Sequence, residues 1–436
     1  MRTGMWAAAL CALAIGTGTP AATPVIDPAT GHRVVRISTA PGMASLYFHQ
    51  NPFTPQGDKM VIATADGIAA IDLKDWSIRP IVRGAGLELL FAGRRTRTVY
   101  YARRGKAGPG GGPNGEVGAT TVFAADIDSG KARTVATIPA GSIGSINADE
   151  TLLLGQVAER AMPLQPGGTG TARYGQADYA ANGPDGKPLP FADAKEVRLN
   201  DRLEAKIPME IFTIDIRTGA RKVVHRATDW LNHLQFSPTD PGLLMFCHEG
   251  PWHKVDRIWT IRTDGSGLTK VHARTMNMEI AGHEYWSPDG KTIWYDLQTP
   301  RGQVFWLAGY DIATRKRTWY HLERDQWSVH YTQSPDGRLF AGDGGDAGMV
   351  AHAPDGKWIY AFTPSAIPDV AGIHAADSAS LIAPGLLTAE KLVDMRGHDY
   401  RLEPNIHFTP DGKWLIFRSN KDGDPQIYAV EVARAR

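Results

Sequence analysis

The chain has 436 residues, a formal net charge of +1 and 42% hydrophobic residues. This balanced charge, without long lysine or arginine blocks, gives no electrostatic support for a nucleic-acid-binding or membrane-surface protein. The 47 glycines and 29 prolines favour a turn-rich globular chain, organised as one large domain or two smaller ones.

Residues 1–22 are predicted to form a secretory signal peptide. Arg2 supplies the positive charge, an apolar stretch follows at 5–16, and small residues form the cleavage site. The apolar stretch is too short to span a bilayer. Leu10 precedes Cys11 where a lipoprotein signal requires a small residue, so we expect a periplasmic or secreted protein without a lipid anchor. Cys247 is then the lone cysteine of the mature chain, and we expect it to be buried in a strand.

One phrase recurs along the remaining chain: an aromatic or polar residue, a turn of Pro, Asp or Gly, and a short alternating apolar strand. Its copies begin at residues 53, 91, 146, 236, 286, 333 and 408. A second hairpin follows most copies, with a strand that ends in Asp, a turn and a returning strand. Two hairpins make a four-stranded unit, and repetition every 40 to 50 residues or so is typical of a β-propeller.

The seven phrases predict an all-β, seven-bladed propeller in a single domain at residues 30–434. The last blade supplies only three strands, so we expect an N-terminal strand at 34–40 to complete it and close the ring. Three segments interrupt the repeat, at 103–118, 168–206 and 365–380. For the long insertion at 168–206, a functional lid and a disordered loop both remain open.

Histidines recur just before the turn phrases, near the end of the channel where propellers bind ligands. The five residues concerned are His49, His233, His283, His330 and His407. One such histidine alone would be a structural residue beside a strand. Five at nearly the same place in their blades predict imidazoles on one rim, which could bind a divalent metal or transfer protons.

Glu403, Asn405 and His407 form a second cluster, spaced two residues apart. In an extended strand their side chains would share one face. Together with His330 they predict a mixed nitrogen and oxygen site, which suits Mn²⁺ or Ca²⁺. The alternative is a solvated strand face.

The run at 246–259 contains His248, Glu249 and Arg257. The planar guanidinium of Arg257 could bind a carboxylate, or it could form a salt bridge with Asp256 or Glu249. No G-x-S-x-G motif occurs, which disfavours nucleophilic serine chemistry.

The phrases CHEGPW at 247–252, HEYW at 283–286 and SVHYTQSPDGRLFAGDGGDAG at 328–348 make the chain resemble oligogalacturonate lyases, seven-bladed propellers that act on short pectin fragments. The resemblance is strong from about 230 to 420 and weaker from 47 to 228. It implies a metal-assisted β-elimination on an acidic oligosaccharide, yielding a 4,5-unsaturated uronide, with manganese as the expected metal and calcium as the alternative.

The resemblance also implies roles for individual residues. His283 would be the base, Arg257 would hold the substrate, and His330 would be a metal ligand. The chain departs from the family at Glu403 and Asn405, which stand where relatives have histidines, and at Tyr400, which stands for a glutamine. Glu403, Asn405 and His407 would then complete the metal site.

The residues expected to bind substrate are His49, His233, His248, Glu249 and Arg418. A second hypothesis remains: a periplasmic TolB-like propeller that binds a protein or sugar without chemistry. The row of histidines favours the lyase, because a binding scaffold does not need so many imidazoles.

Overall fold

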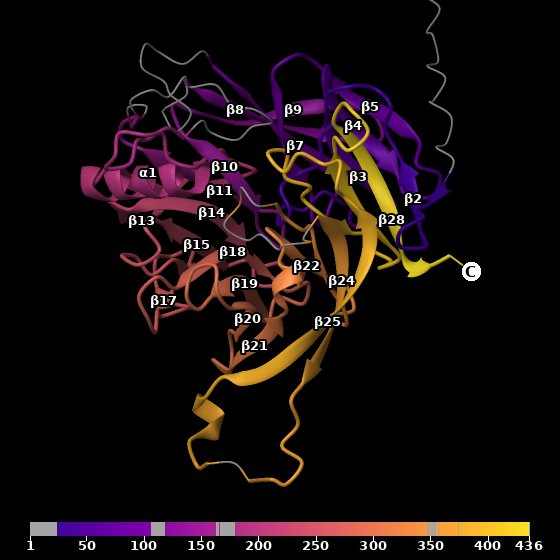
Figure 1. The fold of residues 1–436 in the computed structure, drawn as a ribbon. Helices are drawn as coiled ribbons and strands as arrows, with labels where there is room; N and C mark the ends of the chain where they lie inside the picture. Colours follow the sequence, from indigo (N-terminus) through magenta and orange to yellow (C-terminus); the bar gives the residue numbers. More distant parts are fainter. Residues whose placement is uncertain are drawn as a thin grey trace, which may run out of the picture.

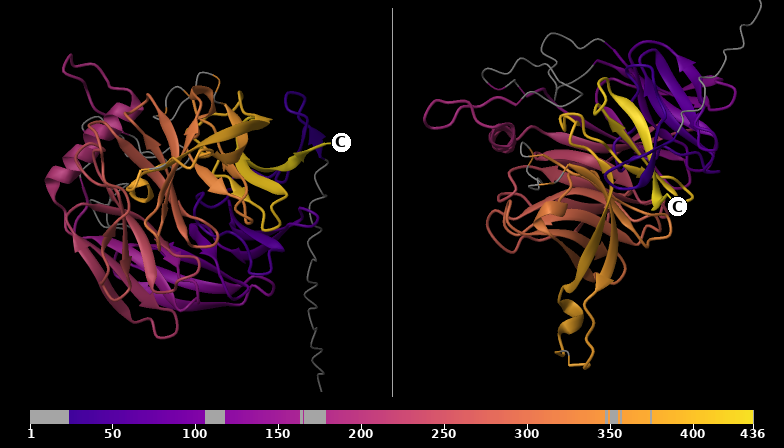
Figure 2. Two further views of the ribbon diagram at one scale, coloured as in Figure 1. Left: turned by 90° about the horizontal axis from the view of Figure 1, so that it is seen from below. Right: turned by 45° about the vertical axis from the view of Figure 1, so that its right-hand side comes forward.

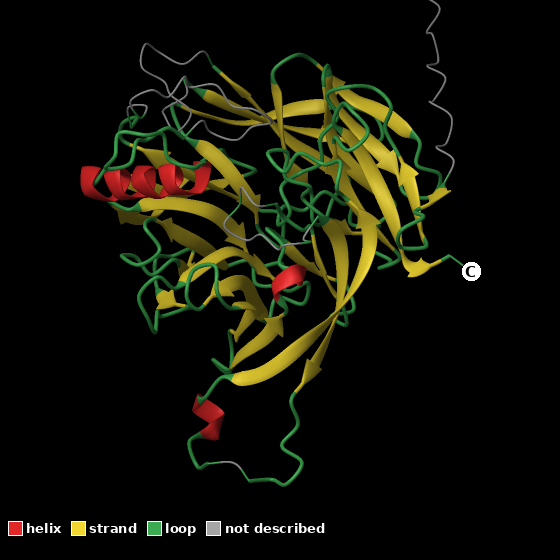
Figure 3. Ribbon diagram, in the orientation of Figure 1, coloured by secondary structure: helices red, strands yellow, loops and turns green. Residues whose placement is uncertain are grey.

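The computed structural model describes residues 24–105, 118–162, 165, 179–346, 349, 355, 357–373 and 375–435. The predicted signal peptide lies outside the described residues. Within them the regular elements are strands apart from one α-helix and two short 3-10 helices, η1 (Arg324–Gln326) and η2 (Ser378–Ser380) (Figure 3). The expectation of an all-β chain is confirmed. No helix in the described ranges is long and apolar enough to cross a bilayer.

The strands of the first half form three consecutive antiparallel units, which we call blades 1 to 3 (Figure 1). Blade 1 contains β3 (Lys59–Thr64), β4 (Gly67–Asp72) and β5 (Ile78–Arg83). Blade 2 contains β6 (Leu87–Ala92), β7 (Thr98–Arg104), β8 (Thr120–Asp126) and β9 (Ala132–Ile138). Blade 3 contains β10 (Ser142–Ile146), β11 (Leu152–Ala158), β12 (Met209–Asp215) and β13 (Arg221–Ala227).

The later strands form three sheets, and we divide the eight-stranded one into blades 5 and 6, which gives blades 4 to 7. Blade 4 contains β14 (Trp230–Phe236), β15 (Leu243–Glu249), β16 (Ile258–Arg262) and β17 (Thr269–Lys270). Blade 5 contains β18 (Ile280–Trp286), β19 (Thr292–Gln298), β20 (Phe305–Asp311) and β21 (Arg317–Leu322). Blade 6 contains β22 (Tyr331–Gln333), β23 (Phe340–Gly342), β24 (Trp358–Ala366) and β25 (Ala383–Asp394), and blade 7 contains β26 (His407–Phe408), β27 (Trp414–Ser419) and β28 (Gln426–Arg434).

The blades are arranged around a centre (Figure 2, left). The first strand of a blade contacts that of the next in several places, from β6 to β10, from β10 to β14 and from β22 to β26. In blade 1 the innermost segment pairs with β3 through isolated bridges, Ala44 to Ala63 and Phe53 to Met60. Residues between those bridges are therefore free to leave strand geometry.

An N-terminal strand completes blade 7, as the sequence predicts. β2 (His32–Arg36) pairs antiparallel with β28, with Val35 opposite Ala429, and β1 (Val25–Ile26) adds to its outer edge. The pairing occupies an edge of β28 that would otherwise present unpaired backbone groups.

Two interruptions of the repeat have defined structure. The 365–380 segment lies in a long hairpin of β24 and β25 that projects from the body of the molecule (Figure 1), and β25 also pairs in parallel with β21 of blade 5. The described part of the 168–206 insertion contains helix α1 (Phe191–Ala205). Sequence reasoning missed this helix, because the segment stood out only as a break in a strand repeat.

Cys247 is fully buried in β15, as expected. The blades carry alternating apolar side chains that pack against neighbouring blades, for example Leu154, Phe246 and Leu244 between blades 3 and 4. Packing of this kind leaves polar groups to the channel and its two ends.

Candidate active site

Three non-glycine residues in or just before an inner strand adopt a left-handed backbone: His233 in β14 with φ 49°, His283 in β18 with φ 45° and Asn405 before β26 with φ 50°. The pairing register of β14 shifts between Asn232 and Gln235, and that of β18 between Gly282 and Tyr285. Such bulges redirect a side chain, and strained backbone of this type persists where the surroundings fix it, often at functional sites.

Counting back from the turn proline gives the equivalent positions. Four residues lie five positions before the proline of their own turn phrase: His233 before Pro238, His283 before Pro288, His330 before Pro335 and Asn405 before Pro410. His407 precedes its proline by three, so it corresponds to Gln235 and Tyr285 instead. The five histidines are expected at nearly the same place, but only His233, His283 and His330 share one position, because His49 precedes Pro55 by six residues and His407 precedes Pro410 by three. The proline register was readable in the sequence and would have shown this.

His283 is held by Asp296 of the neighbouring strand β19, with 2.8 Å between His283 Nδ1 and Asp296 Oδ1. A Cβ atom on Gly282, which lies opposite Asp296, would come within 3.1 Å of that oxygen, so glycine leaves room for the contact. Donation from Nδ1–H to the carboxylate leaves the lone pair on Nε2. Burial lowers the pKa of His283, although Asp296 opposes this effect.

His330 repeats this arrangement in blade 6. Its Nδ1 lies 2.8 Å from Asp343 Oδ2, and both side chains are fully buried. The ring centroids of His283 and His330 are 4.8 Å apart. His330 Nε2 lies 3.2 Å from the Tyr47 hydroxyl. Two imidazoles are therefore fixed side by side, each with its Nε2 directed away from a carboxylate.

Glu403 adds a carboxylate to this pair. Burial opposes its ionisation, but His330 and His283 outweigh burial and lower the pKa of Glu403. Arg418 also belongs to this region, and its Nε donates to the Glu403 carbonyl oxygen over 2.7 Å. Tyr400, at the position implied for a glutamine, donates its hydroxyl to the Asp343 carbonyl over 3.0 Å.

Arg257 lies on the other side of the site and pairs with Glu284. Arg257 Nε donates to Glu284 Oε2 over 2.9 Å, and His233 Nδ1 lies 3.0 Å from Glu284 Oε1 and 2.9 Å from Arg257 Nη2. Neither of the expected partners forms this salt bridge, since Asp256 instead binds Lys270. Glu284 is fully buried, and sequence reasoning passed over it although it lies in the HEYW phrase.

Glu249 and His248 point to opposite faces of β15, because neighbouring strand residues alternate. Glu249 Oε2 accepts from Asn232 over 2.7 Å, and Lys195 of α1 lies 3.7 Å from Glu249 Oε1. His248 instead bonds Asp229 over 2.7 Å and packs against Phe246 and Trp259. The expectation that His248 joins the site is therefore wrong.

The segment Leu46–His49 packs against the histidines of the site. Phe48 stacks on His330 with 4.6 Å between ring centroids, and its backbone N–H donates to Asn405 Oδ1 over 3.2 Å. His407 Nε2 lies 3.1 Å from the Leu46 carbonyl oxygen, to which it can donate. Asn405 and His407 thus hold the backbone of this segment.

This arrangement corrects the proposed metal ligands in blade 7. The left-handed backbone at Asn405 breaks strand alternation, so Glu403, Asn405 and His407 do not share a face. Both ends of the Asn405 amide bond the backbone, at Phe48 and at Glu403. His407 faces the opposite side of the Leu46–His49 segment.

A sequence profile described as oligogalacturonate lyase matches residues 189–435, more than half of the chain. This chain belongs to the oligogalacturonate lyase family. An oligogalacturonide lyase of Pectobacterium atrosepticum is 24% identical to it, covering 93% of this chain and 95% of the relative. An oligogalacturonate lyase of Dickeya dadantii is 28% identical over 51% of this chain and 55% of that protein.

Two solved structures share the fold of this family member. An oligogalacturonate lyase in complex with manganese matches with a TM-score of 0.69 and 22% identity, covering 97% of this chain and 99% of the other. An oligogalacturonate lyase from Vibrio parahaemolyticus matches with a TM-score of 0.67 and 20% identity, covering 94% of this chain and 96% of the other. Propeller geometry is therefore common to this chain and its relatives.

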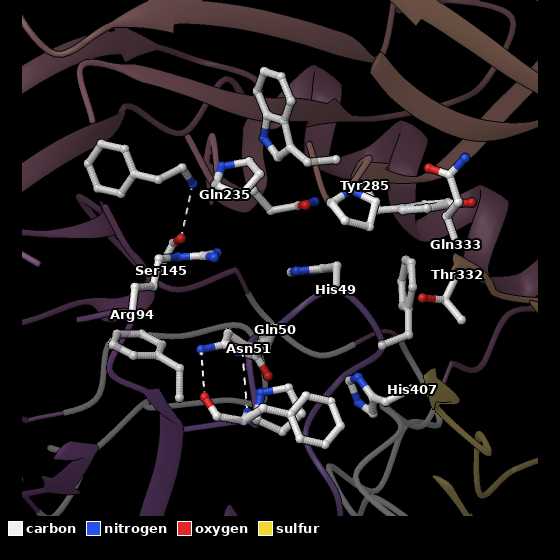
Figure 4. A pocket seen from close by; sticks show the side chains of 18 of the residues that line it. His49, Gln50, Asn51, Arg94, Ser145, Gln235, Tyr285, Thr332, Gln333 and His407 are labelled. Carbon is white, nitrogen blue, oxygen red and sulfur yellow. Dashed lines mark hydrogen bonds between the residues drawn. The ribbon is translucent and has the colours of Figure 1, made fainter. Parts of the chain in front are cut away.

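A cavity of about 250 Å³ lies on the other side of the Leu46–His49 segment of this oligogalacturonate lyase family member (Figure 4). The prolines of four turn phrases line it, so it opens toward the turns. His49 and His407 both face it (Figure 4). Burial, together with nearby His233, lowers the pKa of His49 to about 3. His49 therefore lies between the cavity and the cluster that contains His233.

Two groups in the lyase fold have the donor chemistry of a metal site. In the described ranges, the ligand atoms of His233, Cys247 and Glu284 lie within 4.8 Å of one another. The guanidinium of Arg257 already bonds His233 and Glu284, so a second cation there would be repelled. The other group, His330 with Glu403, has an imidazole fixed through Nδ1 and a carboxylate beside it, and it fits a divalent metal better.

Proposed function

We propose that this chain is a metal-dependent lyase that cleaves oligogalacturonate by β-elimination to give a 4,5-unsaturated uronide. The observation that carries this proposal is the hydrogen-bonded pair of His283 and Asp296 beside His330. The ring centroids of His283 and His330 are 4.8 Å apart. Membership of the family and relatives named for oligogalacturonate or oligogalacturonide support it.

His283 is the base in this proposal. Its Nε2 takes the proton from C5 of a uronate, the electron pair forms the C4–C5 double bond, and the C4–O bond breaks toward the leaving sugar. That oxygen then receives a proton from solvent. The Asp296 carboxylate holds the ring and stabilises the imidazolium that forms, a role that contributes to general base catalysis.

The substrate carboxylate next to C5 must be neutralised before the proton can leave. Arg257 supplies a fixed guanidinium for this purpose, because Glu284 and His233 hold it in place. His233, Glu249, His49 and Arg418 surround the same region, and we propose that they shape the site around the acidic oligosaccharide.

His330 and Glu403 are the residues that would hold the metal. Manganese is the favoured ion because an imidazole and a carboxylate form a mixed donor set, and because a related solved structure contains manganese; calcium is the alternative. When bound, the ion would supply positive charge for the uronate carboxylate and so favour removal of the C5 proton. We also propose a periplasmic or secreted location, based on the predicted signal peptide at residues 1–22.

The test is the ultraviolet absorbance of the unsaturated uronide, measured with oligogalacturonate and added Mn²⁺ or Ca²⁺. His283→Ala should lower the rate by about 10²- to 10⁴-fold without changing the far-ultraviolet circular dichroism. Equal rates in both proteins would remove His283 as the base. A wild-type protein that binds the oligosaccharide but never generates the absorbance would favour the non-catalytic TolB-like propeller.

A further inference from the structure

We infer that Lys195 of α1 forms a second carboxylate-binding subsite, which holds the uronate next to the one bound by Arg257. This inference rests on the proposed function, since it concerns the same acidic oligosaccharide. It assigns a substrate-binding role to the inserted helix.

Helix α1 belongs to the β11–β12 connection and lies beside β13 and β14 (Figure 1). Arg301, in the connection between β19 and β20, donates to Asp193 over 2.7 Å and to Glu196 over 2.7 Å. The helix therefore spans from blade 3 to blade 5, at the end of the blades where Arg257 directly precedes β16. Its position is fixed by one guanidinium that bridges two carboxylates of the helix through charge-assisted hydrogen bonds.

Further contacts tie the helix to the blades beneath it. The Arg202 guanidinium lies 4.4 Å from the centroid of the Trp230 ring, and Gln165 donates to the Ala194 carbonyl oxygen over 3.0 Å. Ala194 and Leu199 are buried. A helix docked this firmly presents Lys195 from a rigid element and not from a mobile loop.

Lys195 points toward the charged groups of the site. Its Nζ lies 3.7 Å from Glu249 Oε1, and 32% of the side chain is exposed. At that separation the pair is an electrostatic contact beyond ordinary hydrogen-bond length. Within the described parts of the chain the ammonium forms no hydrogen bond, so its three N–H donors remain available to a ligand.

The electrostatics agree with a ligand-binding cation. Burial would lower the pKa of Lys195, but Glu249 and Tyr179 outweigh burial and raise it, so the ammonium stays charged. Both Lys195 and Arg257 act on Glu249, whose pKa falls to about 2. Glu249 thus interacts with two cations, and the site offers two positive groups to a substrate with one carboxylate per sugar.

The simpler reading is that Lys195 only balances the buried charge of Glu249. In that case its removal would change the free energy of unfolding and leave the apparent affinity for substrate unaltered. Asn232 donates to Glu249 over 2.7 Å, so this carboxylate keeps a hydrogen-bond donor when Lys195 is replaced. Kinetics and stability together therefore separate the two roles.

The experiment compares Lys195→Met, Lys195→Arg and the control Lys187→Met on trigalacturonate with Mn²⁺. Lys187 lies in the same insertion, its side chain is 82% exposed, and its ammonium lies 3.6 Å from Asp185 Oδ2. Lys195→Met should raise KM about tenfold or more with kcat changed by less than about threefold, because a charge-assisted contact is lost. Lys195→Arg should restore most of the affinity, and Lys187→Met should behave as wild type.

Suppose that the wild type cleaves trigalacturonate and that Lys195→Met and Lys187→Met have the same KM. This result would overturn the subsite and leave the lyase proposal intact. If the wild type cleaves no oligogalacturonate, the proposed function fails, and calorimetry with the same trimer then decides on Lys195. Wild-type binding that weakens about tenfold in Lys195→Met alone would still support the subsite. Binding that is equal in both proteins, or absent from both, would reject it.

Discussion

The His283 imidazole and the Asp296 carboxylate meet across neighbouring strands of one blade, with 2.8 Å between Nδ1 and Oδ1. The side chain of Asp296 is 3% exposed, so its carboxylate has little freedom to turn away. One blade therefore fixes both the orientation and the tautomer of the proposed base.

Asp296→Asn should reduce kcat by about 10²- to 10⁴-fold, because an amide neither holds the required tautomer nor stabilises the imidazolium. The measurement is the steady-state rate of absorbance increase on oligogalacturonate. Thermal unfolding serves as the control for folding. A kcat within about twofold of the wild type would contradict a role for Asp296 in positioning His283.

Glu284→Gln should lower the free energy of unfolding by about 3–5 kcal/mol, since it leaves the guanidinium of Arg257 buried without its partner charge. Denaturant titration measures this loss. The matched control is Asp240→Asn, which breaks an exposed pair with Arg262 and should cost less than about 1 kcal/mol. An equal loss of unfolding free energy in the two variants would show that Glu284 does not stabilise the buried charge of Arg257.

Glu403→Ala should weaken Mn²⁺ binding more than about tenfold, whereas His407→Ala should leave it unchanged. His407 holds the Leu46 carbonyl oxygen, so its removal should instead destabilise the fold by about 1 kcal/mol. Calorimetric titration with Mn²⁺ gives the affinities directly. If His407→Ala no longer binds Mn²⁺, His407 is a metal ligand, as the sequence predicts.

Acid should destabilise the wild type more steeply than Glu249→Gln. The Glu249 carboxyl has a pKa of about 2 in the folded state against an ordinary 4.5, so its contribution is fully present above pH 4.5 and is lost as pH falls toward 2. Across this pH range the shift in the Glu249 pKa changes the free energy of unfolding by about 3 kcal/mol. Urea unfolding across that pH range measures it, with the exposed Asp66→Asn as control. Parallel pH curves for wild type and Glu249→Gln would refute the effect.

Removal of divalent metal with a chelator should abolish lyase activity, and Mn²⁺ should restore it. The fold itself should persist, because the blades pack through apolar clusters that do not involve His330 or Glu403. Circular dichroism before and after chelation checks this. Full activity in demonstrably metal-free protein would exclude a catalytic ion.

The sequence alone determined the strand repeat and the closure of blade 7 by an N-terminal strand. Turn residues and alternating apolar strands are local signals, so each hairpin can be recognised without its neighbours. The same signals predicted that His283 and His330 lie on one rim of the channel, whereas the role of Arg257 came from the resemblance to the lyase family. They could not identify partners such as Asp296 and Asp343, which lie on adjacent strands and resemble other acidic residues in the chain.

Only the tertiary structure decided which polar residues meet. Strand alternation sends His248 away from the site and Glu249 into it, and the left-handed backbone at Asn405 separates Glu403 from His407. Helix α1 brings Lys195 to the site from an insertion whose sequence gave no sign of its target. Spacing along a chain reports a shared face only while the backbone stays regular, and this site is built from bulges, left-handed residues and an inserted helix.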